Sequence, residues 1–426
     1  MEQYASLDTF RPRLRSDIIL GPPWLNKEKI VHYLKDTATE RYYRIGEKED
    51  FLLRKMDGSR TLQEIGNEYE EIYRHHLSSH SWKQIMAHLS ERHLLTETSN
   101  SIPVATLRPG VPGQKYIIDQ GKHQQRFVLF SPDSFLTKLM PWANFAFHPI
   151  FITIALLIIV MLEIFVLRHS AQLITEIAGD LSSYFQFPFG LIFIVEIWLF
   201  FLAHEFAHGL TCKYFGGAVK EIGIMRQLYY FFPYCKIDDV LLFYNRWHRV
   251  YTAAAGIFIN LLMLLPFTVL WWLTSEQGFF EHTPLRVVSA FTLIIINGIT
   301  LINIFPFFGS DGYLMLCYTL NILDISQVES DIFREKLKQA DNDKILINRF
   351  ITLSYRVINN IHRIAYSIGS VLLGFMLILI LFKREGVAFL LPFASIVISY
   401  YIFPFVLFSL AMIAHHRGNI LNKRIH

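Results

Sequence analysis

The stretch Ala203-His204-Glu205-Phe206-Ala207-His208-Gly209 stands at the end of a long apolar run, residues 187–202. On a helix, residues four apart lie on one face about one turn apart, so His204 and His208 are placed to bind one metal ion. Glu205 projects about 100° away, near enough to hold a water molecule without having to be a ligand. Zinc bound there would lower the pKa of that water, and Glu205 would accept its proton. The stretch therefore predicts a zinc site with His204 and His208 as ligands and Glu205 as general base.

The alternative to this interpretation is a chance match. In a soluble protein a single histidine is more often structural than a metal ligand. In a bilayer, however, two histidines and a carboxylate on an apolar helix are costly unless they are paired, bound to metal or facing water. The apolar setting of the motif therefore favours a metal site.

The composition indicates a membrane protein that crosses the bilayer several times. Of 426 residues, 52% are hydrophobic and 18% are charged, and the mean hydropathy is +0.32. The formal net charge of +4 is too small to indicate nucleic-acid binding. The three cysteines, Cys212, Cys235 and Cys317, form no metal-type pair and are expected to be free. The amino-terminal residues hold no apolar run of signal-peptide length, so no cleaved signal is expected.

Residues 1–135 are polar, with mixed charge, and are expected to form a small domain outside the membrane. An Asp57-Gly58 turn precedes a helix whose N-cap is Ser59 or Thr61. The segments 115–119 and 125–129 are expected to form a short hairpin, giving a small α+β domain of winged-helix type. Helices are expected at 27–35, 48–55, 61–74 and 81–95.

Residues 136–426 contain the apolar stretches and are expected to form the membrane domain. Each stretch approaches the length of about 20 residues that crosses a bilayer. The six expected spans are 149–167, 186–207, 250–273, 286–306, 364–382 and 387–413. Between the second and third spans, residues 219–249 predict a β-hairpin that dips into the membrane, or alternatively an interfacial aromatic anchor. An edge strand there would bind an extended substrate segment.

Basic residues in the connecting segments predict the orientation of the chain in the membrane. They gather at 213–249, at 334–363 and in the tail, whereas the opposite loops carry Glu176, Asp180, Glu276 and Glu281. The amino-terminal domain and the carboxyl terminus are therefore expected in the cytoplasm. Lys383 and Arg384, in a short turn, run against this rule.

A third metal ligand is expected on another span, because a catalytic zinc usually takes three protein ligands and a water. The segment Asn303-Ile304-Phe305-Pro306-Phe307-Phe308-Gly309-Ser310-Asp311-Gly312 breaks a span at Pro306 and Gly309. Irregular backbone at membrane depth is tolerated only beside protein or water, so Asp311 is the candidate. The alternative is an Asp-Gly turn at the membrane surface.

These motifs together resemble the site-2 protease family of intramembrane zinc metalloproteases. His204, Glu205 and His208 match its first motif, and Asn303, Pro306, Asp311 and Gly312 match its second. Gly256 and Asn260 match a Gly-x-x-x-Asn feature on the span between them. The resemblance covers residues 185–320. The family usually has more prolines and a second glycine around its aspartate, whereas here Phe307 and Phe308 precede it and Tyr313 follows. This difference affects the shape of the pocket more than metal ligation.

The resemblance implies one zinc ion per chain, bound by His204, His208 and Asp311, with Glu205 as the general base. Asn260 and Asn303 would then support the substrate carbonyl or the oxyanion. The substrate would be a peptide or a segment of a membrane protein within the lipid bilayer.

The amino-terminal residues 17–97 resemble the PqqD-type module, which binds leader peptides of ribosomally made, modified peptides. The resemblance rests on Tyr42-Tyr43-Arg44-Ile45-Gly46 and on the Asp57-Gly58-Ser59-Arg60-Thr61 turn. It implies a bacterial cell-membrane protein that acts in peptide maturation or export, with an export system as a partner. A scaffolding or regulatory domain is the alternative.

Glu163 and Glu196 lie within apolar spans. Each either faces a cavity that admits hydrolytic water or is protonated and bonded to a neighbouring helix, and we expect the second.

The sequence thus predicts an intramembrane zinc metalloprotease. A non-proteolytic exporter subunit or immunity component that keeps a structural zinc is the main alternative, although such a site would not need Glu205. A metal transporter is a weaker one, because the spans hold few ionisable residues.

Overall fold

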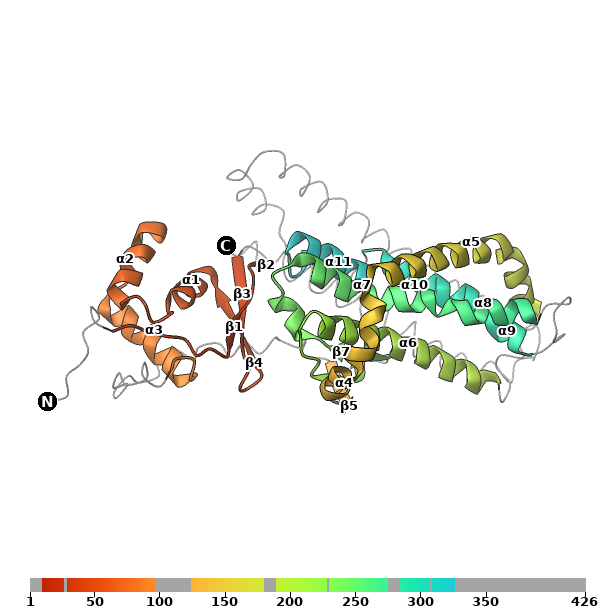
Figure 1. Ribbon diagram of the computed structural model, residues 1–426, viewed down its shortest axis with the longest axis horizontal. Coiled ribbons are helices and arrows are strands. Elements are labelled where there is room, and N and C mark those ends of the chain that lie inside the picture. Colours follow the sequence, from red (N-terminus) through yellow and green to blue (C-terminus); the bar gives the residue numbers. More distant parts are fainter. Residues whose placement is uncertain are drawn as a thin grey trace, which may run out of the picture.

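The computed structural model describes residues 10–26, 29–96, 124–179, 189–227, 230–274, 284–306 and 309–325. The amino-terminal domain lies at one end of the molecule, and a bundle of long helices extends away from it (Figure 1). The predicted spans 364–382 and 387–413 and the whole 334–363 segment lie outside the described residues.

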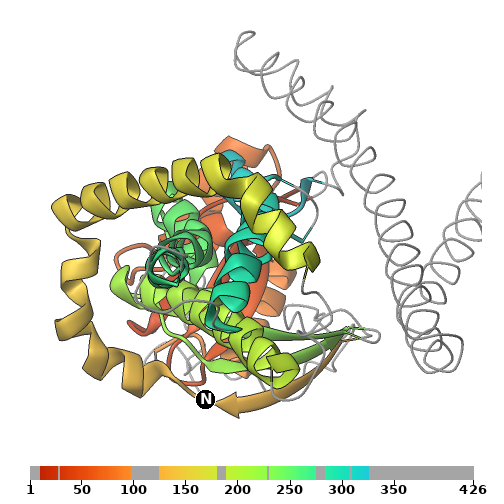
Figure 2. The same ribbon diagram turned by 90° about the vertical axis from the view of Figure 1, so that its right-hand side faces the viewer.

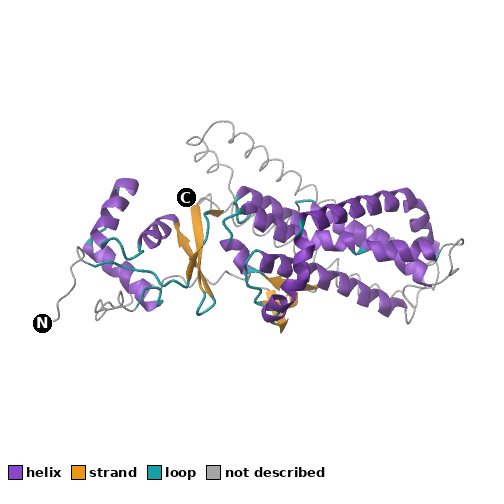
Figure 3. Ribbon diagram, viewed as in Figure 1, coloured by secondary structure: helices purple, strands orange, loops and turns teal. Residues whose placement is uncertain are grey.

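The amino-terminal domain packs helices on a small antiparallel sheet (Figure 3). Strand β3 lies between β1 and β2 on one side and β4 on the other. The buried cluster of this domain includes Leu34, Leu62, Ile65 and Trp82. Its elements are β1 (Ile18–Leu20), β2 (Trp24–Asn26), β3 (Lys29–Asp36), β4 (Arg41–Gly46), α1 (Glu47–Lys55), α2 (Leu62–Tyr73) and α3 (Ser79–Glu91).

Local signals explain most of these elements. The backbone N–H of Glu64 donates to the Thr61 side chain, and the Thr61 N–H donates to the Glu64 carboxylate, so Thr61 is the N-cap of α2. Gly58 turns the chain with φ +86°, a conformation that favours glycine. The predicted helix at 27–35 is wrong where the structure describes it, because Lys29–Asp36 is the strand β3. Its β-branched and aromatic residues suit a strand that pairs on both edges.

A second, three-stranded sheet has the order β5-β6-β7. Strands β6 (Glu221–Gln227) and β7 (Tyr230–Lys236) form the predicted hairpin. Strand β5 (Gln124–Phe130) pairs with β6, and residues 115–119, the expected partner of this strand, lie outside the described residues. The predicted pairing of strands within residues 219–249 is thus confirmed, and β5, from the segment before α5, adds a third strand.

The membrane-type helices follow. Within the part of the chain that the structure describes, three are long and apolar enough to cross a membrane: Pro149–Ile177, Arg246–Leu273 and Leu285–Ile304. Residues 189–207 of the predicted span 186–207 lie in the helix α6. The elements are α4 (Asp133–Ala143), η2 (Asn144–Phe147), α5 (Pro149–Gly179), α6 (Phe189–Tyr214), η4 (Asp238–Leu242), α7 (Arg246–Leu262), α8 (Leu264–Leu273), α9 (Pro284–Phe291), the π-helical η5 (Thr292–Ile296), α10 (Asn297–Ile304) and α11 (Asp311–Leu320).

The helices of this body pack through one apolar cluster contributed by α5, α7, α8, α9 and η5, with Leu173, Leu264 and Leu293 at its centre. Viewed along the bundle, α4 and α5 pass around the outside of the other helices (Figure 2). The α5 residues Leu157, Met161 and Leu167 are hydrophobic and exposed on the outside of the described helices. This pattern suits a helix that has protein on one side and lipid on the other.

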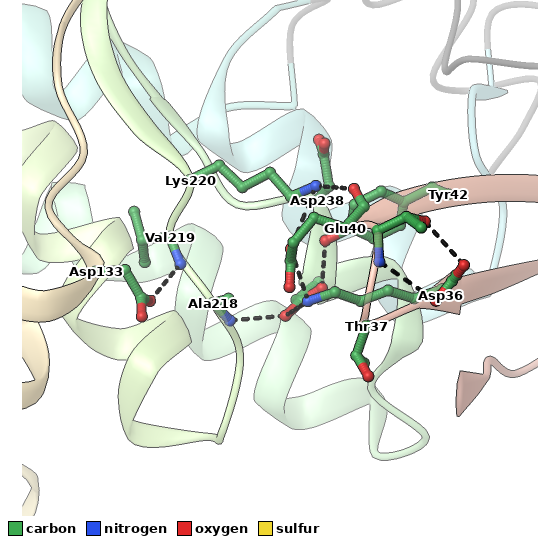
Figure 4. Close-up of polar contacts among 12 residues, drawn as sticks. Asp36, Thr37, Glu40, Tyr42, Asp133, Ala218, Val219, Lys220 and Asp238 are labelled. Carbon is green, nitrogen blue, oxygen red and sulfur yellow. Dashed lines mark hydrogen bonds and ion pairs between the residues drawn. The ribbon is translucent and has the colours of Figure 1, made fainter. Parts of the chain in front are cut away.

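Asp133 joins α4 to the start of the hairpin. Burial alone would raise the pKa of this carboxyl, but hydrogen bonds from the Lys213 ammonium and the Val219 N–H outweigh burial and lower its pKa. The Asp133–Val219 contact is drawn in Figure 4. The segment before the first span is thereby tied to the loop after α6.

The amino-terminal domain is docked on the membrane body through buried groups. Trp24 is fully buried, donates its indole N–H to the Leu241 carbonyl and lies under the Arg249 guanidinium. Leu25 exchanges backbone hydrogen bonds with Asn321 and Leu323, directly after α11. Strand β2 therefore fixes the carboxyl end of α11.

A buried ion pair forms the second part of this interface. The Lys35 ammonium lies 2.9 Å from Asp239, and the two side chains are only 4% and 9% exposed. Asp239 also accepts hydrogen bonds from the Tyr42 hydroxyl and the Ala218 N–H. Burial and this carboxylate together raise the pKa of Tyr42, so the phenol stays protonated. Lys220 bonds to Glu40 beside them (Figure 4).

Replacing Asp239 by alanine is expected to loosen this interface strongly. Removing one partner of a buried pair leaves the other charge uncompensated, which costs about 3–5 kcal/mol. Thermal unfolding in one detergent, followed with trypsin cleavage between the domains, measures the effect. Glu68→Ala is the control, because the Lys55–Glu68 pair is about one third exposed and contributes less than about 1 kcal/mol. Equal unfolding temperatures for the two variants would contradict the prediction.

Candidate metal centre

The predicted metal ligands come from two helices that meet inside the bundle. His204 and His208 lie one turn apart on α6, and Asp311 is the first residue of α11. Ser310 caps α11 by accepting the Tyr313 N–H, and the preceding Gly309 has φ +91°. The turn after α10 thus delivers Asp311 to α6. The Asp311 side chain is only 12% exposed, so this Asp-Gly turn faces the protein interior and not an open loop.

The ligand atoms of these three residues converge. The Asp311 carboxylate lies 2.9 Å from Nε2 of His204 and 3.5 Å from Nε2 of His208. One ligand atom from each residue falls within 4.8 Å of the others. The two histidine side chains are 11% and 8% exposed. Two imidazole nitrogens and one carboxylate are a donor set that suits zinc and leaves a position for water.

The neighbouring helix α7 orients His208 and leaves room for both rings. Nδ1 of His208 lies 2.7 Å from the Thr252 carbonyl, to which it donates, so Nε2 keeps its lone pair for a metal. One turn further, Gly256 faces the same rings. A Cβ at Gly256 would lie 2.5 Å from Nε2 of His204 and 2.6 Å from Nε2 of His208. The absence of a side chain at Gly256 therefore creates the space in which the histidines meet Asp311.

Asn303, near the end of α10, holds the aspartate. Its Nδ2 donates to Asp311 at 2.8 Å, and its Oδ1 accepts the Asp311 backbone N–H at 3.0 Å. Gly312 closes this turn against α10, since a Cβ there would lie 2.0 Å from the Ile304 carbonyl oxygen. Both polar atoms of the Asn303 amide are thus engaged with Asp311, so this residue positions the ligand.

Glu205 follows His204 on α6 and is half-buried. It interacts electrostatically with both histidines and with Asp311, and the Cys235 backbone lies beside it. Gly209, one turn later on the same face, lets β7 approach, because a Cβ there would lie 3.0 Å from the Cys235 sulfur. The carboxylate is therefore placed between the ligand cluster and β7.

Asn260 lies one turn beyond Gly256 on α7 and is buried. Its Nδ2 lies 3.5 Å from the Thr300 hydroxyl of α10, and its Oδ1 has no hydrogen-bond partner among the described residues. The sequence analysis missed Thr252 and Thr300. Their positions, four residues before Gly256 and three before Asn303, place them on the same helix faces as these motif residues.

Comparison with protein-family models, with curated proteins and with solved structures found no match to this chain.

Proposed function

We propose that this protein is an intramembrane zinc metalloprotease. The observation that carries the proposal is the convergence of His204, His208 and Asp311, within 4.8 Å, from two helices of an apolar bundle. A buried carboxylate beside two imidazoles is costly at membrane depth unless the groups are paired or bind a cation. The half-buried Glu205 adds a group that a structural metal site would not need.

The chemistry follows from the side chains. Zinc held by His204, His208 and Asp311 would acidify a water molecule and polarise the scissile carbonyl. Glu205 accepts the proton of the attacking water and later donates it to the leaving amine. Thr252 and Asn303 act indirectly, because they hold the orientation of His208 and Asp311. Asn260 supports the substrate carbonyl in this proposal.

The hairpin supplies a means of presenting the substrate. A helical segment hides its peptide bonds, so hydrolysis requires an extended stretch of chain. Among the described residues, strand β7 is terminal in the order β5-β6-β7, and it packs on α6 at Gly209, one turn after Glu205. A peptide added to the free edge of β7 would therefore lie beside the general base.

The proposal extends to the whole chain. Six spans would place the protein in a bacterial cell membrane, with the amino-terminal domain and the carboxyl terminus in the cytoplasm. The amino-terminal domain would bind the leader of a ribosomally made peptide, and an export system would take the product. The contacts of β2 with Asn321 and Leu323 support a link between the amino-terminal domain and the metal centre, since they connect that domain to α11, which begins at Asp311.

Metal analysis of the purified protein tests the proposal. We expect about one zinc ion per chain in the wild type. His208→Ala and Asp311→Ala should each lose most of this zinc, because two remaining ligands hold the ion weakly. His169→Ala is the matched control, since that ring bonds within α5 to the Phe165 carbonyl. No zinc in wild type purified without chelator, or unchanged zinc in both variants, would contradict the proposal.

A further inference from the structure

The segment from α9 through η5 to α10 carries a line of buried polar side chains inside the bundle. Four of them are at most 3% exposed: Ser289, Thr292, Asn297 and Thr300. Asn303 continues the line to the metal centre by bonding Asp311. Polar residues at membrane depth are retained for packing between helices or for function.

Three of these side chains contact a polar side chain on a different helix. Thr292 donates to Glu196 of α6. Asn297 donates to Glu163 of α5 at 3.1 Å, and Thr300 lies 3.5 Å from Asn260 of α7. The contacts thus connect this segment to α6, α5 and α7.

The π-helical turn brings two of these contacts to one side. The backbone N–H of Asn297 bonds to the Thr292 carbonyl, five residues earlier. In a regular α-helix five residues rotate about 140° past one turn, whereas in a π-helix they complete little more than one turn. Asn297 therefore lies below Thr292, and π-turns of this kind occur frequently at functional sites.

These hydrogen bonds do not satisfy all the polar atoms of the buried side chains. Among the described residues, four buried acceptor oxygens have no hydrogen-bond partner: Glu196 Oε2, Glu163 Oε1, Asn297 Oδ1 and Asn260 Oδ1. Packing between helices accounts for the contacts that are made. It does not account for Glu163 and Asn297. A neutral carboxylic acid and an amide that only packed together would form two hydrogen bonds with each other. These two side chains form one, and each keeps an oxygen without a partner among the described residues.

The two amide oxygens require hydrogen-bond donors, and each unused carboxyl oxygen requires a donor, or an acceptor where it carries the proton of the neutral acid. Water supplies both, and it is the usual partner of buried polar atoms that no protein group satisfies. At about 1.5 Å per residue, the steps 292 to 297, 297 to 300 and 300 to 303 span about 5–8 Å each, which one or two water molecules bridge. These polar side chains do not form a path for metal ions. Within the described part of the chain, only His204, His208 and Asp311 bring three possible metal-ligand atoms together.

We propose that a file of water molecules follows this line to the metal centre from the membrane face opposite the amino-terminal domain. Its outer end lies at α9, which begins at the end of the bundle farthest from that domain (Figure 1). There the Arg286 guanidinium pairs with the Glu176 carboxylate at 2.7 Å. Its inner end is the Asn303–Asp311 contact. The purpose of the file, to supply water and exchange protons for hydrolysis, rests on the proposed function.

Hydroxyl-radical labelling tests the water file directly. X-ray pulses form hydroxyl radicals from water, and these radicals oxidise only the side chains next to the water molecule from which they form. Thr292→Cys and Asn297→Cys are made separately in full-length protein whose Cys212, Cys235 and Cys317 are replaced by alanine, and are reconstituted in lipid nanodiscs. Ile299→Cys is the matched control, because it lies on the same segment and is 47% exposed on the apolar exterior.

We expect oxidation at positions 292 and 297 to be severalfold faster than at position 299. Adding Glu196→Leu should slow the labelling at position 292, because it removes an acceptor. Oxidation of both path cysteines at the rate of the Ile299→Cys control would overturn the proposal, and would mean that protein groups satisfy these oxygens. The labelling uses neither substrate nor zinc, so its failure is distinguishable from failure of the proposed function. The helicity of each variant is first compared with that of the parent protein. Either Thr292→Cys or Asn297→Cys is enough to decide the result, provided that it folds.

Discussion

Glu205→Gln is expected to reduce peptide hydrolysis by about 10²- to 10⁴-fold while the protein keeps its zinc, since a general base contributes rate enhancement of this size. Glutamine preserves the size and hydrogen-bonding capacity of the side chain but cannot accept the proton of the attacking water. The ligands His204, His208 and Asp311 are unchanged, so zinc content should equal that of the wild type. Cleavage of fluorescein-labelled casein in detergent, beside metal analysis of the same sample, measures both quantities.

Glu221→Gln is the matched control for this experiment. Glu221 lies on β6, where it accepts a hydrogen bond from the Tyr234 hydroxyl, outside the ligand cluster. It should retain activity. Wild-type cleavage by Glu205→Gln would remove the proposed role of this carboxylate. If the wild type keeps zinc but cleaves nothing, and Glu205→Gln preserves the cellular phenotype, the exporter or immunity interpretation would be favoured.

Gly256→Ala is expected to abolish high-affinity zinc binding, and activity with it, through a single methyl group. The added carbon would lie 2.5 Å from the His204 ring and 2.6 Å from Nε2 of His208. The His208 ring cannot turn away freely, because its Nδ1 bonds to the Thr252 carbonyl on the same helix as Gly256. The clash therefore falls on the two ligands themselves.

The helix itself should tolerate this substitution. Alanine in a helix interior is favoured over glycine by about 1 kcal/mol, so loss of zinc would not result from a weaker helix. Gly298→Ala on α10 is the matched control, because a Cβ there has no heavy atom within 4 Å. Zinc per chain and thermal unfolding are measured for both variants. Full zinc content in Gly256→Ala would show that α7 lies farther from α6 than the structure has it.

Prediction from sequence succeeded where the signal is local. The Thr61 cap, the Asp57-Gly58 turn and the 219–249 hairpin depend on residues close together in the chain. Prediction failed for Lys29–Asp36, because a short segment of mixed polarity fits both a helix and a strand. Pairing with β1, β2 and β4 makes this segment a strand, and β1 precedes it by about ten residues, beyond the range of a local signal.

The sequence by itself determined the kinds of ligand and their helical spacing. His204 and His208 share a face wherever that segment is helical, and the break at Pro306 and Gly309 marks Asp311 as a candidate. Only the tertiary structure decided that Asp311 reaches both rings, that Thr252 orients one of them, and that Gly256 makes the space. It also showed that Glu163 and Glu196, each expected to bond a neighbouring helix, do so, and that each still has one oxygen without a partner among the described residues. The physical reason is that these relations join residues 44 to 134 positions apart, so they depend on how the helices pack rather than on the order of residues along any one helix.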